Sequence, residues 1–251
     1  MNIAILSGRY PNTSFESASN HKIYADHYGY TYIHCNWATG ERNRYFNKIR
    51  YIEYYFGFFD YIIWLDDDAF FWNMEQDIMQ YLPKGDHFIS LCESPSFKTL
   101  KTHFSSGQFI IKTNELAKEF LTAILSTDIQ LVKKWWNIDL GYFSNGDQDI
   151  MIYLSLSDKR FINGLKLYNY KKFNSRVQNL KEKDIHHPLI LHFTGTVQIK
   201  NKDYKWVQKQ FNLHPSLVSK NITSKYQLFS NPKKVKFKIR VLKKIKVWLR
   251  S

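Results

Sequence analysis

Three consecutive aspartates follow an apolar run in this 251-residue chain, and they are the groups best suited to carry chemistry. The run Tyr61–Leu65 leads into Asp66, Asp67 and Asp68. In an extended chain Asp66 and Asp68 project to one side. Two carboxylates about 6 Å apart repel by roughly 3 kcal/mol at an effective dielectric near 20, so the pair needs a cation or a raised pKa. A divalent metal is the simplest answer and a solvated acidic turn is the alternative; an EF-hand is excluded, because its sixth position would be Phe71 instead of glycine.

A histidine at the end of a second apolar run could complete this site. His192 lies within the apolar segment 188–193. A histidine in such a place is more often a core residue whose hydrogen bonds are made inside the protein than a ligand. Together with the two same-side aspartates, it makes an N/O ligand set that favours Mn²⁺ over Ca²⁺, with Mg²⁺ as the alternative. Such a site keeps open positions for phosphate oxygens. Lys200 and Lys202 follow closely and could hold a diphosphate as point charges.

The segment Asn145–Asp149 places carboxylate and amide groups at a predicted helix start. Helix capping explains acidic groups at such a position without any further function. If the segment lies beside the metal pair, Asp147 and Gln148 become candidates for the reaction itself.

Alternating strands and helices must position these groups. Short apolar runs rich in β-branched and aromatic residues predict strands, and longer segments with near-helical apolar spacing predict helices. The order β-α-β-α-β predicts a doubly wound α/β sheet, with ligands at the carboxyl ends of parallel strands. The first five elements are expected at Asn2–Ser7, Ser17–Tyr28, Tyr30–Cys35, Asn43–Phe56 and Tyr61–Leu65.

The second half of the chain continues the pattern. Further strands are expected at Asp86–Leu91, Gln108–Lys112 and Pro188–Phe193, and helices after the cap Thr113-Asn114 and at Asp147–Ser155. The helix after Asn114 carries one apolar stripe, so its role is structural. Together these elements predict a single α/β domain with a Rossmann-like mixed sheet flanked by helices.

Composition and charge exclude several classes. A hydrophobic content of 44% with 17% aromatic residues excludes a disordered or low-complexity chain. The net charge of +14 is concentrated after Asp203, the last acidic residue: Tyr204–Ser251 hold 13 Lys and Arg. The preceding part is nearly neutral, so no specific nucleic-acid partner is expected. The catalytic domain is predicted at 1–203 and a basic extension at 204–251.

The basic extension ends in a segment that suits a membrane surface. Residues 232–251 carry nine Lys and Arg and no acidic residue. Leu242, Ile245, Trp248 and Leu249 fall at helical spacing opposite basic residues, which predicts an amphipathic helix at an anionic membrane. A solvated tail, or one docked on its own domain, is the alternative.

Two further features indicate the compartment. No leader-like or membrane-spanning segment is evident, since the longest apolar runs fall far short of the roughly 20 residues needed to cross a bilayer. Cys35 and Cys92 lie beside strand-like runs without metal-type spacing and are expected as core thiols in a reducing compartment. A cytoplasmic protein, peripheral on the cytoplasmic face of the membrane, is therefore expected.

Five segments in order resemble one group of enzymes. The phrase Trp64–Ala69 looks like the DxD motif of metal-dependent nucleotide-sugar glycosyltransferases of the GT-A fold, most closely family 34, with family 8 as a relative in style. The other four segments similar to that family are His21–Tyr30, Ser105–Ile111, Asp147-Gln148 and His192–Gly195. The resemblance spans about residues 1–203.

The resemblance implies roles for individual residues. Asp66, Asp68 and His192 would hold Mn²⁺, while Asp147 and Gln148 would face the donor sugar and the reaction centre. The candidate nucleotide and diphosphate contacts are Ser7, Gly8, Lys48, Asp66, Asp67, Gly195, Lys200 and Lys202.

The implied reaction is transfer of a hexose, galactose being the first expectation, from a UDP-sugar to a saccharide or lipid-linked oligosaccharide acceptor with retention of configuration. Polysaccharide, lipopolysaccharide or capsule synthesis is the expected setting. The pairs Trp135-Trp136 and Tyr142-Phe143 could stack acceptor sugars, although core packing is the more common role of such residues.

Two other function classes stay open at this point. A metal-dependent phosphohydrolase or nuclease would use the same acidic strand end. A nucleic-acid-binding module would use the basic extension, and a steep salt dependence of binding would identify it.

Overall fold

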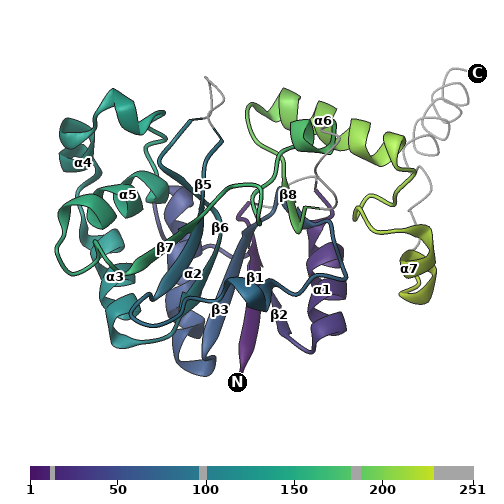
Figure 1. Cartoon of the computed structure of the whole chain (residues 1–251), viewed down its shortest axis with the longest axis horizontal. Helices are drawn as coiled ribbons and strands as arrows, with labels where there is room; N and C mark the ends of the chain where they lie inside the picture. The colour runs from purple at the N-terminus through teal and green to yellow at the C-terminus, as the bar shows by residue number, and fades with distance from the viewer. Residues whose placement is uncertain (12–14, 96–100, 182–187, 229–251) are drawn as a thin grey trace, which may run out of the picture.

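A six-stranded mixed sheet with strand order β2-β1-β3-β6-β5-β7 forms the centre of the protein (Figure 1). The computed structural model describes residues 1–11, 15–95, 101–181 and 188–228. Strands β2 and β3 both pair parallel to β1, β6 lies antiparallel between β3 and β5, and β7 is parallel to β5. The strands are β1 (Ile3–Gly8), β2 (Thr31–His34), β3 (Tyr61–Asp66), β5 (Ile89–Glu93), β6 (Phe104–Lys112) and β7 (Leu165–Tyr168).

Helices cover both faces of this sheet, which explains why the central strands β1 and β3 are apolar over most of their length. Successive side chains of a strand point to opposite faces. Ala4 and Leu6 pack in the core on the side of α2, α3 and α5, whereas Ile3 and Ile5 pack on the side of α1. The long helices are α1 (Ser17–Tyr28), α2 (Asn47–Tyr55), α3 (Glu115–Ser126), α5 (Asp147–Ser157) and α6 (Val197–Gln210), and the short ones α4 (Ile129–Trp135) and α7 (Lys220–Lys225).

A second, two-stranded sheet lies beside the first. Strand β4 (Ala69–Phe71) pairs antiparallel with β8 (Ile190–His192). Helix α6 and the segment after it cover this small sheet through a cluster of buried apolar residues: Phe70, Leu191, Phe193, Tyr204, Val207 and Leu217. Helix α6 therefore crosses the boundary expected at 203–204, and the residues directly after Asp203 pack on the domain.

Most expected elements are present, with informative differences. Helix α1 and the parallel β1–β3 set lie as predicted, and Asn114 caps α3 by accepting from the Ala117 amide. Strand β6 begins four residues earlier than expected, because the polar stretch before Gln108 is buried in the sheet. Elements β4, β7, α4, α6 and α7 were not predicted.

Both cysteines are buried free thiols, as expected. Burial raises the pKa of Cys35 to about 12 and also raises the pKa of Cys92. None of the helices within the described ranges combines the length and apolarity that crossing a bilayer requires. The amphipathic helix expected near the C-terminus lies outside the described residues.

Candidate active site

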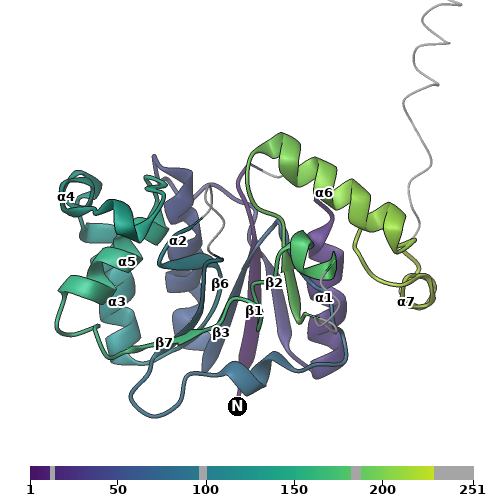
Figure 2. The ribbon, with the colours of Figure 1, turned by 45° about the horizontal axis from the view of Figure 1, so that its top comes forward.

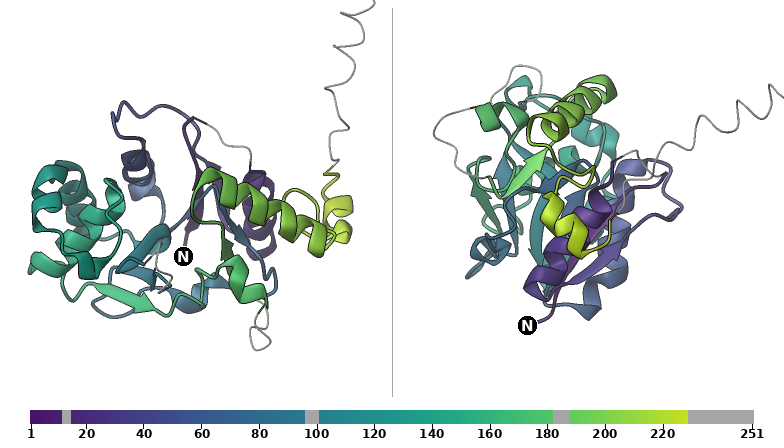
Figure 3. Two further views of the ribbon diagram at one scale, coloured as in Figure 1. Left: turned by 90° about the horizontal axis from the view of Figure 1, so that it is seen from above. Right: turned by 90° about the vertical axis from the view of Figure 1, so that its right-hand side faces the viewer.

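The candidate functional residues gather at the carboxyl ends of the parallel strands. Strand β1 lies between β2 and β3 in this part of the sheet. Gly8 and Asp66, the last residues of β1 and β3, are register partners. Seen from above, α6 and the region of α4 and α5 stand on opposite sides of these strand ends (Figures 2 and 3). Two cavities of about 510 and 190 Å³ open here, and Asp66 and Lys48 line both.

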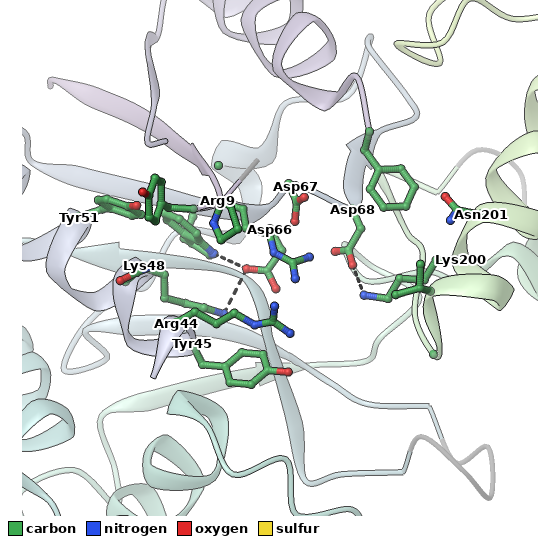
Figure 4. A pocket seen from close by; sticks show the side chains of 18 of the residues that line it. Arg9, Arg44, Tyr45, Lys48, Tyr51, Asp66, Asp67, Asp68, Lys200 and Asn201 are labelled. Atoms are coloured by element: carbon green, nitrogen blue, oxygen red, sulfur yellow. Dashed lines mark hydrogen bonds and ion pairs between the residues drawn. The ribbon is translucent and has the colours of Figure 1, made fainter. Parts of the chain in front are cut away.

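Asp66 is held by two donors and keeps one oxygen for another partner. Its Oδ1 accepts a hydrogen bond from Trp64 Nε1 at 2.7 Å and lies 3.1 Å from Lys48 Nζ (Figure 4). An added Cβ at Gly107 would lie 3.3 Å from its Oδ2 and 2.5 Å from His192 Cε1. The Oδ2 atom therefore faces the same space as the imidazole.

Lys48 connects the metal-ligand candidates to the Asp147 carboxylate. Its buried Nζ lies 3.2 Å from Asp147 Oδ2 and donates to the Ser106 carbonyl oxygen at 3.0 Å. Burial alone would lower the pKa of Lys48, but Asp147 and Asp66 outweigh it and raise the pKa above its usual value. The ammonium thus stays charged and balances two carboxylates.

The small sheet brings His192 beside the aspartates. Ala69 and His192 are register partners of β4 and β8, and the Phe193 amide donates to the Asp68 carbonyl oxygen at 2.9 Å. Gly107 leaves the room that the imidazole occupies. This glycine lies where β6 slips against β5, between the pairs Leu91–Phe109 and Cys92–Ser105, and such irregularities re-aim side chains.

Hydrogen-bond donors behind His192 fix which ring nitrogen carries the proton. Arg176 Nη1 donates to Asn174 Oδ1, and Asn174 Nδ2 donates to the Glu93 carbonyl oxygen at 3.2 Å. A guanidinium has donors only, so the Asn174 oxygen must face it. His192 Nδ1, 3.0 Å from the same oxygen, is therefore the protonated nitrogen. Burial lowers the pKa of His192, so the ring is neutral near pH 7 and its Nε2 is an acceptor.

Two acceptors consequently face each other. His192 Nε2 lies 3.2 Å from Asp68 Oδ1, which has no hydrogen-bond donor within the described part of the chain. Burial would raise the pKa of Asp68, but the Lys200 ammonium holds it below its usual range, so the carboxyl is ionised. Lys200 Nζ donates to the other oxygen, Oδ2.

A cation satisfies this arrangement. Ligand atoms of Asp66, Asp68 and His192 all lie within 4.8 Å of one another. Two carboxylates and one neutral imidazole are an N/O set of the kind that binds Mn²⁺ or a related divalent ion. The residues present therefore fit a metal site.

The first turn of α5 carries two carboxylates that have different partners. Asp149 caps the helix, because it accepts from the amides of Ser144 at 3.1 Å and Gly146 at 3.2 Å. Asp147 instead points to Lys48, and burial raises its pKa against the lowering effect of that lysine. Gln148 Oε1 accepts from the Ser106 amide at 3.1 Å, and Gln148 lines the smaller cavity.

The remaining expected contacts separate into two groups. Gly8, Asp67, Gly195 and Lys200 line the larger cavity together with Lys48 and Asp66. Ser7 and Lys202 line neither cavity. The Ser7 hydroxyl instead lies 2.7 Å from His21 Nδ1 inside the protein, and Lys202 is exposed on α6.

The aromatic pairs also separate. Trp136 and Phe143 pack against the core, with Trp136 Nε1 donating to the Gly141 carbonyl oxygen at 3.0 Å. Trp135 and Tyr142 are exposed, and Tyr142 lines the smaller cavity.

The site also contains residues that the sequence did not single out. Arg9 and Arg44 line the larger cavity, and Arg176 lines the smaller one. Arg9 directly follows Gly8 at the end of the first strand, which was a usable signal. Neither Arg44 nor Arg176 lies in a recognisable motif.

No protein-family model matches this sequence, and no curated protein matches it either. Its structure is similar to solved glycosyltransferases. One is involved in glycosylation of the major capsid of PBCV-1: TM-score 0.60, 14% identity, covering 81% of this chain and 99% of that chain.

Two further solved glycosyltransferases share the arrangement at lower scores. GlyE of Streptococcus pneumoniae TIGR4 gives a TM-score of 0.51 at 14% identity, covering 94% of this chain and 66% of that chain. The bifunctional glycosyltransferase WbbM gives 0.52 at 10% identity, covering 84% and 51%. This chain therefore has the GT-A fold, and the predicted fold class is confirmed.

Proposed function

We propose that this protein is a Mn²⁺-dependent glycosyltransferase that moves a hexose from a UDP-sugar to a saccharide acceptor. The observation that carries the proposal is the cation site between the two cavities, in which His192 Nε2 and Asp68 Oδ1 face each other without a donor between them. The likeness to solved glycosyltransferases supports sugar transfer as the reaction class.

The larger cavity suits the nucleoside diphosphate. Asp66, Asp68 and His192 would hold the metal, which neutralises negative charge on a leaving diphosphate. Lys200 lies at the same place, and Arg9 and Arg44 add positive charge (Figure 4). Thr196, the N-cap of α6, also lines this cavity, so the helix N-terminus adds its partial positive charge.

The smaller cavity suits the sugars. It contains Asp147 and Gln148 on the other side of Asp66 and Lys48. Asp147 is held by Lys48 and is not poised to attack. We therefore expect front-face attack by the acceptor hydroxyl with retention, in which Gln148 stabilises the sugar as positive charge develops on it.

The proposed donor sugar and product class rest on the sequence resemblance. Galactose is the expected sugar, and cell-surface polysaccharide, lipopolysaccharide or capsule the expected product. The basic residues of 232–251 are proposed to bring the enzyme to an anionic membrane, where lipid-linked acceptors are found.

Metal-dependent nucleotide binding tests this proposal. UDP, UDP-galactose, UDP-glucose, UDP-N-acetylglucosamine and GDP-mannose are titrated into the full-length protein with and without Mn²⁺ by calorimetry. We expect binding of UDP and one UDP-sugar only with the metal. Asp68→Ala should lose this binding, because it removes a candidate metal ligand. It should keep its fold, because the Lys200 side chain that loses its ion pair is one-quarter exposed and can reach water.

Asp86→Ala is the matched control, since Asp86 is exposed and lines neither cavity. Wild-type nucleotide binding by Asp68→Ala would contradict the assignment. Hydrolysis of bis-p-nitrophenyl phosphate without any acceptor, lost in the same variant, would identify a phosphohydrolase instead.

A further inference from the structure

Arg176 is a buried cation that the proposed reaction has not used. Its side chain lines the smaller cavity, and the residue is 4% exposed. Its amide donates to Asn179 Oδ1 at 2.7 Å, and the neighbouring Ser175 bridges to Leu191 of β8. The backbone that carries the guanidinium is therefore fixed on both sides.

Unlike the other buried cations of the site, Arg176 forms no direct ion pair, and the Asp68 carboxylate that favours its charged form acts from beyond ion-pair distance. Lys48 lies beside Asp66 and Asp147, and Lys200 beside Asp68. Among the residues that the structure describes, Arg176 has no carboxylate within ion-pair distance. Its Nη1 donates to the Asn174 backbone and side-chain oxygens, while Nε has no acceptor.

Burying such a guanidinium costs free energy unless another group pairs with its charge and its remaining donors. Burial lowers the pKa of Arg176 to about 10, so the guanidinium remains charged at neutral pH. A buried charge without an ion-pair partner is destabilising, and a perturbed ionisable group that lines a cavity is a candidate functional-site residue. A guanidinium fork matches the two oxygens of a carboxylate.

The rest of the cavity lining suits a sugar. Hydroxyl-bearing residues surround the space: Ser94, Thr102, Ser105, Tyr142, Ser144 and Thr194. Hydroxyl groups donate to and accept from sugar hydroxyls, and none of them supplies a negative charge. The two carboxylates that line the cavity, Asp66 and Asp147, both lie beside Lys48.

We infer that the smaller cavity binds a saccharide that carries a carboxylate, with Arg176 as the group that recognises the acid. The inference rests on the proposed glycosyltransferase function and narrows its substrate class to a uronic-acid type of sugar. The carboxylate belongs either to the sugar of the donor or to the acceptor, because both meet in this cavity in the proposed reaction.

Paired ligands that differ only in the acid separate these two sources. In the donor arm, UDP-glucuronic acid and UDP-glucose are titrated into the full-length protein with Mn²⁺. In the acceptor arm, methyl glucuronide and methyl glucoside are titrated in the presence of UDP and Mn²⁺. We expect a preference for the acid of about tenfold or more in one arm, the size of a charged hydrogen-bonded pair.

Three variants assign the preference to Arg176. Arg176→Gln should reduce it to within about twofold, and Arg176→Lys should retain part of it because the charge stays and the fork is lost. Lys134→Gln is the matched control, because Lys134 is an exposed cation of α4 that lines neither cavity. Its acid-to-neutral ratio should stay as in the wild type.

Equal affinity for acid and neutral ligands in both arms, or a full preference in folded Arg176→Gln, would overturn the inference. If Arg176→Gln does not fold, an acid-to-neutral ratio in Arg176→Lys equal to that of the wild type would overturn the inference as well. Methyl glucuronide is also titrated without nucleotide: Arg176-dependent binding there, with no binding of UDP and Mn²⁺, would refute the proposed function and support the acid site alone.

Discussion

At the scale of single residues, Lys48 shows how a buried cation allows two carboxylates to stay ionised inside the site. Its ammonium is buried between Asp66 and Asp147 and also donates to Ser106. Removing one partner of such a buried pair would leave an uncompensated charge, which costs several kcal/mol. Lys48 therefore links the two cavities by electrostatics as well as by position.

Gln148 is expected to act after the substrates bind. Its Oε1 is held by the Ser106 amide, which leaves the Nε2 group to donate toward the smaller cavity. An interaction that strengthens in the transition state changes kcat more than KM. Gln148→Ala should lower kcat about tenfold or more, with donor affinity within a few-fold of the wild type.

Steady-state kinetics with the nucleotide sugar that binds in the calorimetric titrations measure this effect. Gln130→Ala on α4 is the control, since Gln130 is exposed and far from both cavity linings. An effect on KM alone would reassign Gln148 to substrate positioning, and full activity would remove it from the site.

Gly107 is required for the metal ligands to converge. A methyl group there would meet His192 Cε1 at 2.5 Å, far inside contact distance, and the imidazole is buried with little freedom to move. Gly107→Ala should weaken Mn²⁺ binding about tenfold or more. Calorimetric titration of Mn²⁺ checks this, with Gly57→Ala as control, because a Cβ at Gly57 meets nothing within 4 Å. Equal Mn²⁺ affinity in both variants would show that the small sheet of β4 and β8 can shift at little cost in free energy.

At the scale of elements, short strands position the metal ligands. Strands β4 and β8 have three residues each, yet they place His192 opposite Ala69, one residue after Asp68. Their stability comes from burial under α6 rather than from their own ladder, since isolated two-stranded pairs are marginal.

His21 ties three elements together and should make the fold sensitive to acid. On α1, its Nδ1 lies 2.7 Å from the Ser7 hydroxyl of β1 and its Nε2 donates to the Ala69 carbonyl oxygen of β4 at 2.7 Å. Burial lowers its pKa to about 4. The unfolded state then binds more protons than the folded state between this value and the ordinary pKa of about 6.5, so stability falls as the pH falls.

The expected loss is about 2 kcal/mol in the free energy of unfolding between about pH 7.5 and about pH 5. Urea unfolding of wild type and His21→Gln at several pH values isolates this contribution, because glutamine does not titrate in this range. The stability difference between the two proteins should shrink by that amount on acidification. A constant difference would show that His21 binds its proton equally well in the folded and unfolded states.

At the scale of the whole molecule, the basic segment 232–251 is predicted to bind membranes without contributing to catalysis. Residues 204–218 pack on the domain through Tyr204, Val207 and Leu217, so the removable segment begins well after them. Each basic residue near an anionic leaflet contributes on the order of 1 kcal/mol. Deleting residues 232–251 should therefore abolish sedimentation with anionic vesicles.

Transfer to a soluble acceptor fragment should be spared by this deletion, because none of the described cavity-lining residues is removed. A charge-reduced full-length control, with Lys233, Lys234, Lys243 and Lys244 changed to Gln, should bind the vesicles weakly. Equal vesicle binding by the truncated and full-length proteins would exclude the tail as an anchor.

The sequence by itself determined the central strands and the position of the acidic residues that follow them. Short apolar runs rich in β-branched and aromatic residues placed β1, β2 and β3, and the run into Asp66–Asp68 located the acidic strand end, because local patterns report burial directly. The pairing of His192 with these aspartates was also predicted, and their ligand atoms do converge.

Tertiary structure decided what depends on contacts between distant segments. Three-residue strands such as β4 leave too few positions for a periodic signal, and the tautomer of His192 depends on Asn174 and Arg176 from a separate loop. Lys202 and Lys200 look alike in sequence, but only Lys200 faces Asp68, because α6 turns the other lysine outward. Side-chain direction on a helix follows from which face packs, and the sequence near these lysines does not state that.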